Sequence, residues 1–206
     1  MKAGVPMWAL AFLPLSPDSE RWKYLDFGKG AKTKYEFSEG ILNVEANASS
    51  GIFLYVFEKP KAIKKIFVNG EAIANPNINS KEEVDDFPLR IGPVWSGDRR
   101  LSWVEKKFAD NWLVELEQLA DSKGAGLKTI DLGLLAWTGS PKWNQREHPM
   151  SSYFNETVMG RLDAPGKFEF EMNYTDGFEA VAIWIGSDSD QSKSYFKMKI
   201  NKIGYE

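Results

Sequence analysis

Residues 167–174 alternate between polar and apolar side chains, and this pattern constrains the fold more than any other in the chain. Phe168, Phe170, Met172 and Tyr174 occupy every second position, and charged or amide side chains occupy the positions between them. A period of two is the period of an extended strand, whose successive side chains point to opposite faces. The segment is therefore predicted to be a strand of an antiparallel sheet with one buried face and one solvated face.

Short apolar or alternating segments, separated by turn residues, recur along most of the chain. The continuous apolar run Ile52–Phe57 predicts a central strand buried on both faces. Pro88 and Pro93 predict that the strand in residues 87–95 is an edge strand or carries a bulge, and Asn69-Gly70 predicts a tight hairpin turn. A chain of 206 residues that is 43% hydrophobic suffices for one core of this kind. We predict an all-β fold, with residues 1–206 forming a single antiparallel β-sandwich, plausibly a jelly roll.

One segment departs from the strand pattern. Ser102 and Glu105 form the sequence signature of a capping box at a helix start. Apolar residues then recur at spacings of three and four, which places them on one helical face. These residues are Leu101, Val104, Phe108, Trp112, Leu116 and Leu119. We predict one amphipathic α-helix, about Trp103 to Ala120, that packs on a sheet; the alternative is a helix that binds a partner.

The composition excludes several classes of site. The chain has no cysteine, which rules out disulfides, thiolate metal sites and cysteine nucleophiles. His148 is its only histidine, so a metal site built from several histidines is excluded as well. The net charge of −3 argues against nucleic acid as a partner, because such a protein needs an excess of basic residues.

A family resemblance rests on four segments together with the closing strand. These segments are Thr33–Glu36, Ala46–Gly51, Asp85–Ile91 and Ala182–Ser192. In them the chain resembles the bacterial domain-of-unknown-function family 3047, which is similar in architecture to galactose-binding-like jelly rolls. The resemblance implies an exported or envelope protein and assigns no chemistry.

The N-terminal residues 1–20 are interpreted as an extension or the remnant of a signal peptide. Met1-Lys2 and the apolar residues after them resemble the start of such a peptide, although Pro6 and Pro14 interrupt the run. The apolar run Trp8–Leu15 is too short to span a bilayer, so no transmembrane segment is predicted. Together with the resemblance, this predicts a periplasmic or cell-envelope location.

The segment Gly186–Ser192 is dense in oxygen-bearing side chains and lies between two predicted strands, so a hairpin loop is expected there. Asp188 and Asp190 match the opening of a calcium-binding EF-hand loop, but Lys193 and Lys199 replace its required glycine and glutamate. Two interpretations stay open. The two aspartates bind a structural Ca²⁺, or they accept hydrogen bonds from amides of their own loop.

A second candidate site lies in the long polar loop of residues 138–152 and just after it. Trp143 supplies a flat apolar ring for a sugar face, and Asn144, Arg146 and Tyr153 supply groups that bond hydroxyls. Long loops of this kind are often functional. The alternative is that Trp143 anchors the loop to the core.

Asp86 and Arg90 form a third candidate site. They are an even number of residues apart on a predicted extended segment, so their side chains can share a face. They form an ion pair with each other, or they bind a polar ligand.

These patterns predict a non-catalytic envelope module that binds a carbohydrate or similar polar small molecule, with no cofactor other than the Ca²⁺ considered above. One alternative is an enzyme that acts on polysaccharide, as a lyase or a hydrolase, using Tyr153 or His148 with Arg146. Another is a structural or protein-interaction module that uses the predicted helix. The patterns assign no catalytic residue and leave the ligand and the oligomeric state open.

Overall fold

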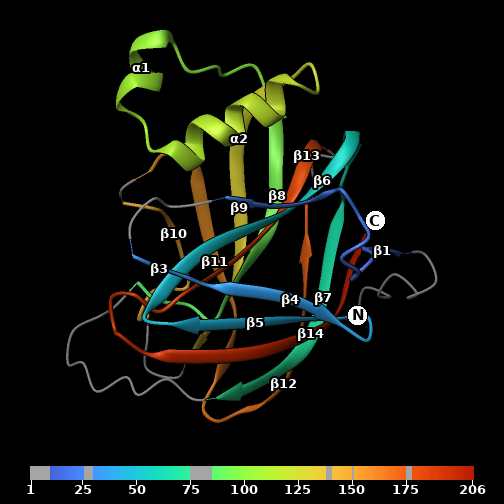
Figure 1. The fold of residues 1–206 in the computed structure, drawn as a ribbon, viewed down its shortest axis with the longest axis vertical. Coiled ribbons are helices and arrows are strands. Elements are labelled where there is room, and N and C mark those ends of the chain that lie inside the picture. Colours follow the sequence, from blue (N-terminus) through green and yellow to red (C-terminus); the bar gives the residue numbers. More distant parts are fainter. Residues whose placement is uncertain (1–9, 26–29, 75–84, 138–140, 150, 175–177) are drawn as a thin grey trace.

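Two β-sheets pack face to face, and two short helices lie on the outer face of one of them (Figure 1). The computed structural model describes residues 10–25, 30–74, 85–137, 141–149, 151–174 and 178–206. The predicted all-β sandwich is confirmed. Strands of the two sheets cross each other in this view, as in sandwiches whose sheets are strongly twisted.

The six-stranded sheet is antiparallel throughout. Its order is β12 (Gly166–Asn173), β7 (Lys65–Ala74), β14 (Tyr195–Tyr205), β5 (Ile41–Asn47) and β4 (Lys34–Ser38), with β1 (Ala11–Phe12) paired to β14. The alternation predicted for residues 167–174 is confirmed in β12, where Phe168, Phe170 and Met172 are buried and the residues between them are exposed.

The second sheet has eight strands, and its residues line the pocket described in the next subsection. Its order is β10 (Gln145–Glu147), β11 (Phe154–Leu162), β9 (Gly126–Trp137), β8 (Leu89–Gly97), β13 (Glu179–Asp188), β6 (Ser49–Ala62) and β2 (Trp22–Leu25), with β3 (Ala31–Lys32) paired to β6. The pairs β9–β11 and β3–β6 are parallel, and the others are antiparallel.

The eight-stranded sheet is apolar on both faces. Phe53 and Tyr55 of β6 point into the core between the two sheets, which we call the inner core. Ile52 and Leu54 of the same strand point the opposite way, into an outer core under the helices. This explains why Ile52–Phe57 is a continuous apolar run, and the prediction of a central strand buried on both faces is confirmed.

The single predicted helix is interrupted. The chain forms α1 (Trp103–Phe108) and α2 (Asn111–Asp121), because Ala109 and Asp110 adopt extended backbone angles between them. The capping box of Ser102 and Glu105 is present at the start of α1 as predicted.

Only the second helix packs on the sheet. Trp112, Leu116 and Ala120 of α2 are buried in the outer core. No residue of α1 is buried, and the side chains of Trp103 and Phe108 are 78% and 81% exposed. Because of the extended break, the apolar residues of α1 do not continue the buried face of α2. The apolar periodicity that predicted one helix therefore corresponds to packing on the sheet only in α2.

The predicted hairpin turn at Asn69-Gly70 is wrong. Both residues lie within the continuous strand β7. A Cβ atom on Gly70 would lie 2.2 Å from the carbonyl oxygen of Lys199 in β14 and 2.7 Å from the ring of Phe168 in β12. Glycine is therefore required here for close approach of neighbouring strands, and not for a turn.

The predicted hairpin loop at Gly186–Ser192 is also wrong. It connects β13, in the eight-stranded sheet, to β14, in the six-stranded sheet. The segment therefore crosses from one layer of the sandwich to the other. Turn composition marked the end of a strand but carried no information on which sheet the next strand joins.

The proline-containing strand β8 is central, between β9 and β13, so the edge alternative is wrong. Its pairing with β9 shifts register between Val94 and Ser96, next to Pro93. The bulge alternative therefore holds, as expected where a residue without an N–H group enters a sheet interior.

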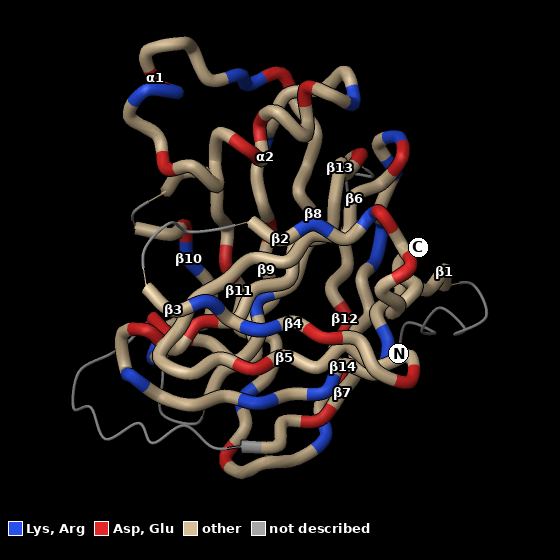
Figure 2. Tube along the Cα trace, in the orientation of Figure 1, with Lys and Arg blue, Asp and Glu red and all other residues tan. Residues whose placement is uncertain are grey.

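Part of the predicted N-terminal extension belongs to the fold. Leu13 and Leu15 are buried in the inner core, and the N–H group of Leu13 donates to the carbonyl of Ile203 at 2.9 Å. Basic and acidic residues are interspersed on the six-stranded sheet (Figure 2), where Glu45 lies 4.0 Å from Lys34 and 3.8 Å from Lys197.

Candidate functional site

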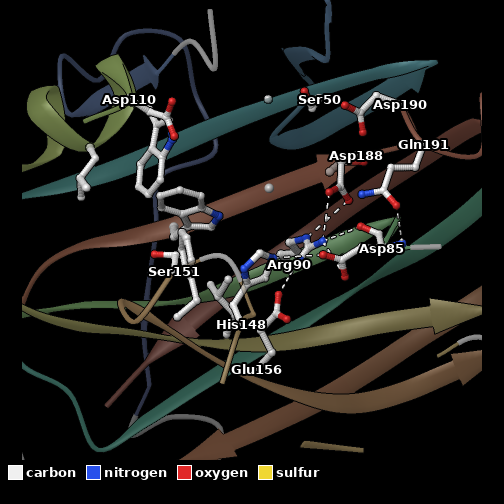
Figure 3. A pocket seen from close by; sticks show the side chains of 18 of the residues that line it. Ser50, Asp85, Arg90, Asp110, His148, Ser151, Glu156, Asp188, Asp190 and Gln191 are labelled. Atoms are coloured by element: carbon white, nitrogen blue, oxygen red, sulfur yellow. Dashed lines mark hydrogen bonds and ion pairs between the residues drawn. The ribbon is translucent and has the colours of Figure 1, made fainter. Parts of the chain in front are cut away.

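A pocket of about 500 Å³ lies on the outer face of the eight-stranded sheet, next to the junction of α1 and α2 (Figure 3). Its volume is in the range that small organic ligands occupy in proteins. The polar lining residues are Ser50, Asp85, Arg90, Asp110, His148, Ser151, Glu156, Ser187, Asp188, Asp190 and Gln191. The others are Gly51, Phe108, Ala109, Trp112, Leu113, Leu132, Phe154, Trp184 and Gly186. We call this cavity the outer-face pocket.

Arg90 of β8 is the centre of a buried ion network in this pocket. Its Nη2 atom donates to Asp188 Oδ2 at 3.0 Å and to the carbonyl oxygen of Asp85 at 2.7 Å. Its Nη1 atom donates to Glu156, which is completely buried. The guanidinium also lies over the ring of Phe87, with its carbon 4.5 Å from the ring centre. Arg90 is therefore held in one orientation from four sides.

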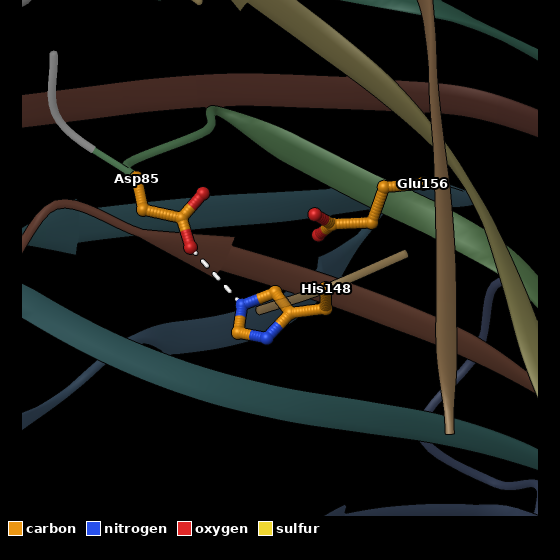
Figure 4. Close-up of side chains that lie close together, drawn as sticks. All are labelled: Asp85, His148 and Glu156. Atoms are coloured by element: carbon orange, nitrogen blue, oxygen red, sulfur yellow. Dashed lines mark hydrogen bonds and ion pairs between the residues drawn. The ribbon is translucent and has the colours of Figure 1, made fainter. Parts of the chain in front are cut away.

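Arg146 and His148 approach the same carboxylates from the other side. The antiparallel pairing of β10 and β11 sets Arg146 opposite Glu156, and Arg146 Nε donates to Glu156 Oε2 at 2.7 Å. Arg146 Nη2 donates to Asp85, and its guanidinium lies 4.0 Å above the ring of Trp143. His148 Nε2 lies 3.1 Å from Asp85 Oδ2, beside Glu156 (Figure 4). Asp85 and Glu156 thus each contact both arginines.

The two aspartates beside Arg90 have pKa values displaced in opposite directions. Burial raises the pKa of Asp85, but the hydrogen bond with His148 and the charges of Arg90 and Arg146 outweigh it and lower the pKa to about 2. Burial also acts on Asp188, and there it outweighs the attraction of Arg90, so the pKa is raised to about 6. For Arg90 itself, the three surrounding carboxylates outweigh burial and raise its pKa.

These displacements predict a stability that depends on pH in two opposite steps. As pH falls from about 7 to about 4, the native state takes up a proton at Asp188 before the unfolded chain does, so stability rises by on the order of 2 kcal/mol. As pH falls further, from about 4 to about 2, the stability contributed by the ionised Asp85 is lost. Urea unfolding across this range tests both steps.

The matched variant for this experiment is Asp188→Asn, which keeps the side-chain size and removes the ionisation. It is expected to abolish the rise in stability between about pH 7 and about pH 4 and to keep the fall below about pH 4. A rise of unchanged size in Asp188→Asn would assign the first step to another group.

Three aromatic rings form the apolar wall of the pocket. The ring centres of Trp112 and Phe154 are 5.5 Å apart, and Trp184 meets both rings edge-on at 5.8 Å and 5.4 Å. Trp184 is 2% exposed, and its indole N–H group has no hydrogen-bond acceptor within the described part of the chain. The Ser187 hydroxyl is in the same situation. Most buried polar groups are paired, so these two unpaired groups are exceptions among the residues that line the pocket.

The structure brings three of the predicted site residues together. Arg90, Asp188 and Asp190 all line the outer-face pocket. Arg146 does not line it, but it contacts two lining carboxylates from behind. Asp86 instead anchors the β13–β14 connection, where its carboxylate accepts from the N–H groups of Ser192 and Gln191 at 2.6 and 3.2 Å.

The other predicted sugar-contact residues lie outside this lining. Trp143 is half-buried, packs against Phe87 and carries Arg146 on its face. Tyr153 is 4% exposed, with the guanidinium of Arg99 4.1 Å above its ring. The Asn144 side chain accepts a hydrogen bond from Arg161 at 3.2 Å. Tyr153 therefore belongs to the outer core, and Trp143 packs against that core.

Two groups of side chains have the composition of a cation site. Asp86, Asp188 and Asp190 each place a carboxylate oxygen within 4.8 Å of the others, as do ligand atoms of Asp85, His148 and Glu156. In the second group, two arginines already neutralise the carboxylates. In the first, Asp86 and Asp188 are engaged by N–H groups of the protein. The structural Ca²⁺ at Asp188 and Asp190 stays a prediction.

Sequence reasoning missed the aromatic wall and Glu156. Trp184 and Phe154 lie in strands, where an aromatic residue predicts burial and not contact with a ligand. Glu156 offers a weak signal, because it shares a strand face with Phe154 and a charged residue on an apolar face needs a partner. Its partner Arg90 lies two strands away, beyond what periodicity can identify.

Comparison with known proteins adds no relative, because no family model, no curated protein and no solved structure matches the chain. The resemblance to family 3047 and the envelope location therefore remain predictions. Within the described residues, neither helix has the length and apolar character needed to cross a bilayer.

Proposed function

We propose that the protein is a module that binds a sugar or a similar polyhydroxylated molecule in the outer-face pocket. The pocket combines the two surfaces that such ligands require. Trp112, Phe154 and Trp184 offer apolar area for C–H groups, and fixed charged groups beside them offer partners for hydroxyls. Glu156 and Asp188 hold Arg90 in place, so the charged groups of the pocket are oriented before a ligand arrives.

The observation that carries this proposal is the buried N–H group of Trp184. An indole N–H group only donates, so it requires an acceptor oxygen. None of the described residues supplies one, although the side chain is 2% exposed and lies at the pocket wall. A hydroxyl or ring oxygen of a ligand would satisfy it. Burying an unpaired donor costs about 1–3 kcal/mol, which ligand binding would recover in part.

Replacing Trp184 with phenylalanine tests this role. Trp184→Phe keeps an aromatic ring and removes the donor, so the affinity for the bound sugar is expected to fall about tenfold. The measurement is isothermal titration calorimetry with ligands found by screening a glycan array with the wild-type protein.

Trp143→Phe is the matched control, because Trp143 also carries an aromatic ring near the network but does not line the pocket. Its affinity is expected to equal that of the wild type. An array on which no glycan binds, or an affinity that falls in Trp143→Phe and not in Trp184→Phe, would contradict the proposal.

A polysaccharide hydrolase or lyase is the second candidate, and one observation favours it. Asp85 and Asp188 both line the pocket and both contact Arg90, yet their pKa values are about 2 and about 6. Carboxyl groups with separated pKa values are typical of a general base and a general acid. New reducing ends or unsaturated products from a bound polysaccharide, abolished in Asp188→Asn, would establish the enzyme; binding without products supports the binding module.

A further inference from the structure

The outer-face pocket has an excess of negative charge. Its lining includes five carboxylates, those of Asp85, Asp110, Glu156, Asp188 and Asp190, and one guanidinium, that of Arg90. Arg146 adds a second guanidinium behind the wall. Two arginines cannot balance five carboxylates, so the pocket repels anionic ligands and attracts cationic ones.

Part of this excess lies at Asp188 and Asp190. Asp188 is paired with Arg90, but the carboxylate of Asp190 has no hydrogen bond or ion pair within the residues that the structure describes. Asp190 still lies close to Asp188, with a carboxylate oxygen of each within 4.8 Å (Figure 3). An unpaired carboxylate beside a second carboxylate offers a site for a further positive group.

The aromatic wall of the same pocket contains an unpaired donor. The buried N–H group of Trp184 has no acceptor within the described residues, and a Cβ atom on the lining residue Gly186 would lie 2.9 Å from it. Gly186 precedes Asp188 by two residues along β13. A ligand that satisfies both Asp190 and Trp184 must therefore carry a cationic donor and a neutral oxygen acceptor.

Resting on the proposed sugar-binding function, we infer that the preferred ligand is an amino sugar, with its protonated amino group on Asp190 and a hydroxyl or ring oxygen on Trp184. A uronate or a sugar phosphate would bring negative charge to the unpaired carboxylate, and a neutral sugar would leave that carboxylate without a counter-charge. An amino sugar matches both the charge of the pocket and its unpaired donor.

The test compares two trisaccharides that share one skeleton: the β-1,4-linked trisaccharide of glucosamine and its fully N-acetylated form, which is neutral. Calorimetry at low ionic strength is expected to show at least tenfold tighter binding of the amino form by the wild-type protein. Asp190→Asn is expected to reduce that preference to less than about threefold. Added salt is expected to weaken binding of the amino form more than of the N-acetylated form. Asp163→Asn, an exposed position outside the pocket, is the control and should keep the wild-type preference.

The outcomes separate this inference from the function on which it rests. Equal or tighter binding of the N-acetylated form leaves sugar binding intact and overturns the amino-sugar preference. Binding of neither trisaccharide, nor of any other glycan, overturns both. A preference that persists unchanged in Asp190→Asn removes Asp190 from the recognition of the amino group.

Discussion

Replacing Arg90 with methionine is expected to lower the free energy of unfolding by about 3–5 kcal/mol. The substitution removes the arginine that pairs with Asp188 and one of the two arginines that pair with Glu156, which is completely buried. A buried ion network adds little stability compared with apolar packing. Removal of one member is nevertheless strongly destabilising, because it leaves a buried charge without its counter-charge. Urea unfolding followed by far-UV circular dichroism measures the loss.

Two further variants define what this result means. Arg21→Met removes an exposed ion pair with Glu58, whose side chain is 77% exposed, and is expected to cost less than about 1 kcal/mol. Arg90→Met combined with Glu156→Gln is expected to recover part of the stability lost in Arg90→Met, because the second substitution removes the buried negative charge of Glu156. Equal losses in Arg90→Met and Arg21→Met would show that the network is not desolvated.

Replacing Gly92 with alanine is expected to cost about 3 kcal/mol or more. Gly92 lies in β8, and a Cβ atom there would be 1.9 Å from the carbonyl oxygen of Asp131 in β9. No side-chain rotation relieves a contact with the backbone, so β8 and β9 must separate. The strands on either side of this contact carry Arg90 and Leu132, so the distortion is expected to extend to the outer-face pocket.

Gly166→Ala is the matched control for this change. Gly166 begins β12, and a methyl group added at this position would lie 4.0 Å from its nearest neighbouring atom, the carbonyl oxygen of Ala164. The free energy of unfolding is expected to change by no more than about 0.5 kcal/mol. A loss in Gly92→Ala as small as in Gly166→Ala would mean that β8 and β9 are less closely packed at this point.

Local pattern predicted the strands and failed on their arrangement. The alternation of β12 and the double burial of β6 follow from side-chain periodicity, which depends only on neighbours along the chain. The turn predicted at Asn69-Gly70 was wrong because glycine also occurs where neighbouring strands approach closely, as it does at Gly70. Whether the chain after Asp188 turns back or crosses to the other sheet depends on contacts distant in sequence, which periodicity does not contain.

The same limit applied to the candidate site. Asp188, Asp190 and Arg90 were identified as candidate site residues because they are charged residues within or next to predicted strands. The tryptophans of the pocket wall have the pattern of core residues, and by burial they are core residues. Their place at a pocket wall depends on how α2 covers the outer face and leaves part of it open beside Asp188. A close-packed core and a ligand wall are made from the same residue types, so composition does not distinguish them.

The parallel pairing of β9 and β11 has a consequence for protein engineering. Parallel neighbours cannot be joined by a tight reversal, so the connection from β9 to β11 has to be long, and it includes β10. That connection also carries Arg146 and His148 to the carboxylates of the pocket. Grafting this site onto another scaffold would therefore require the two flanking strands as well, and trimming the connection would disconnect the sheet together with the site.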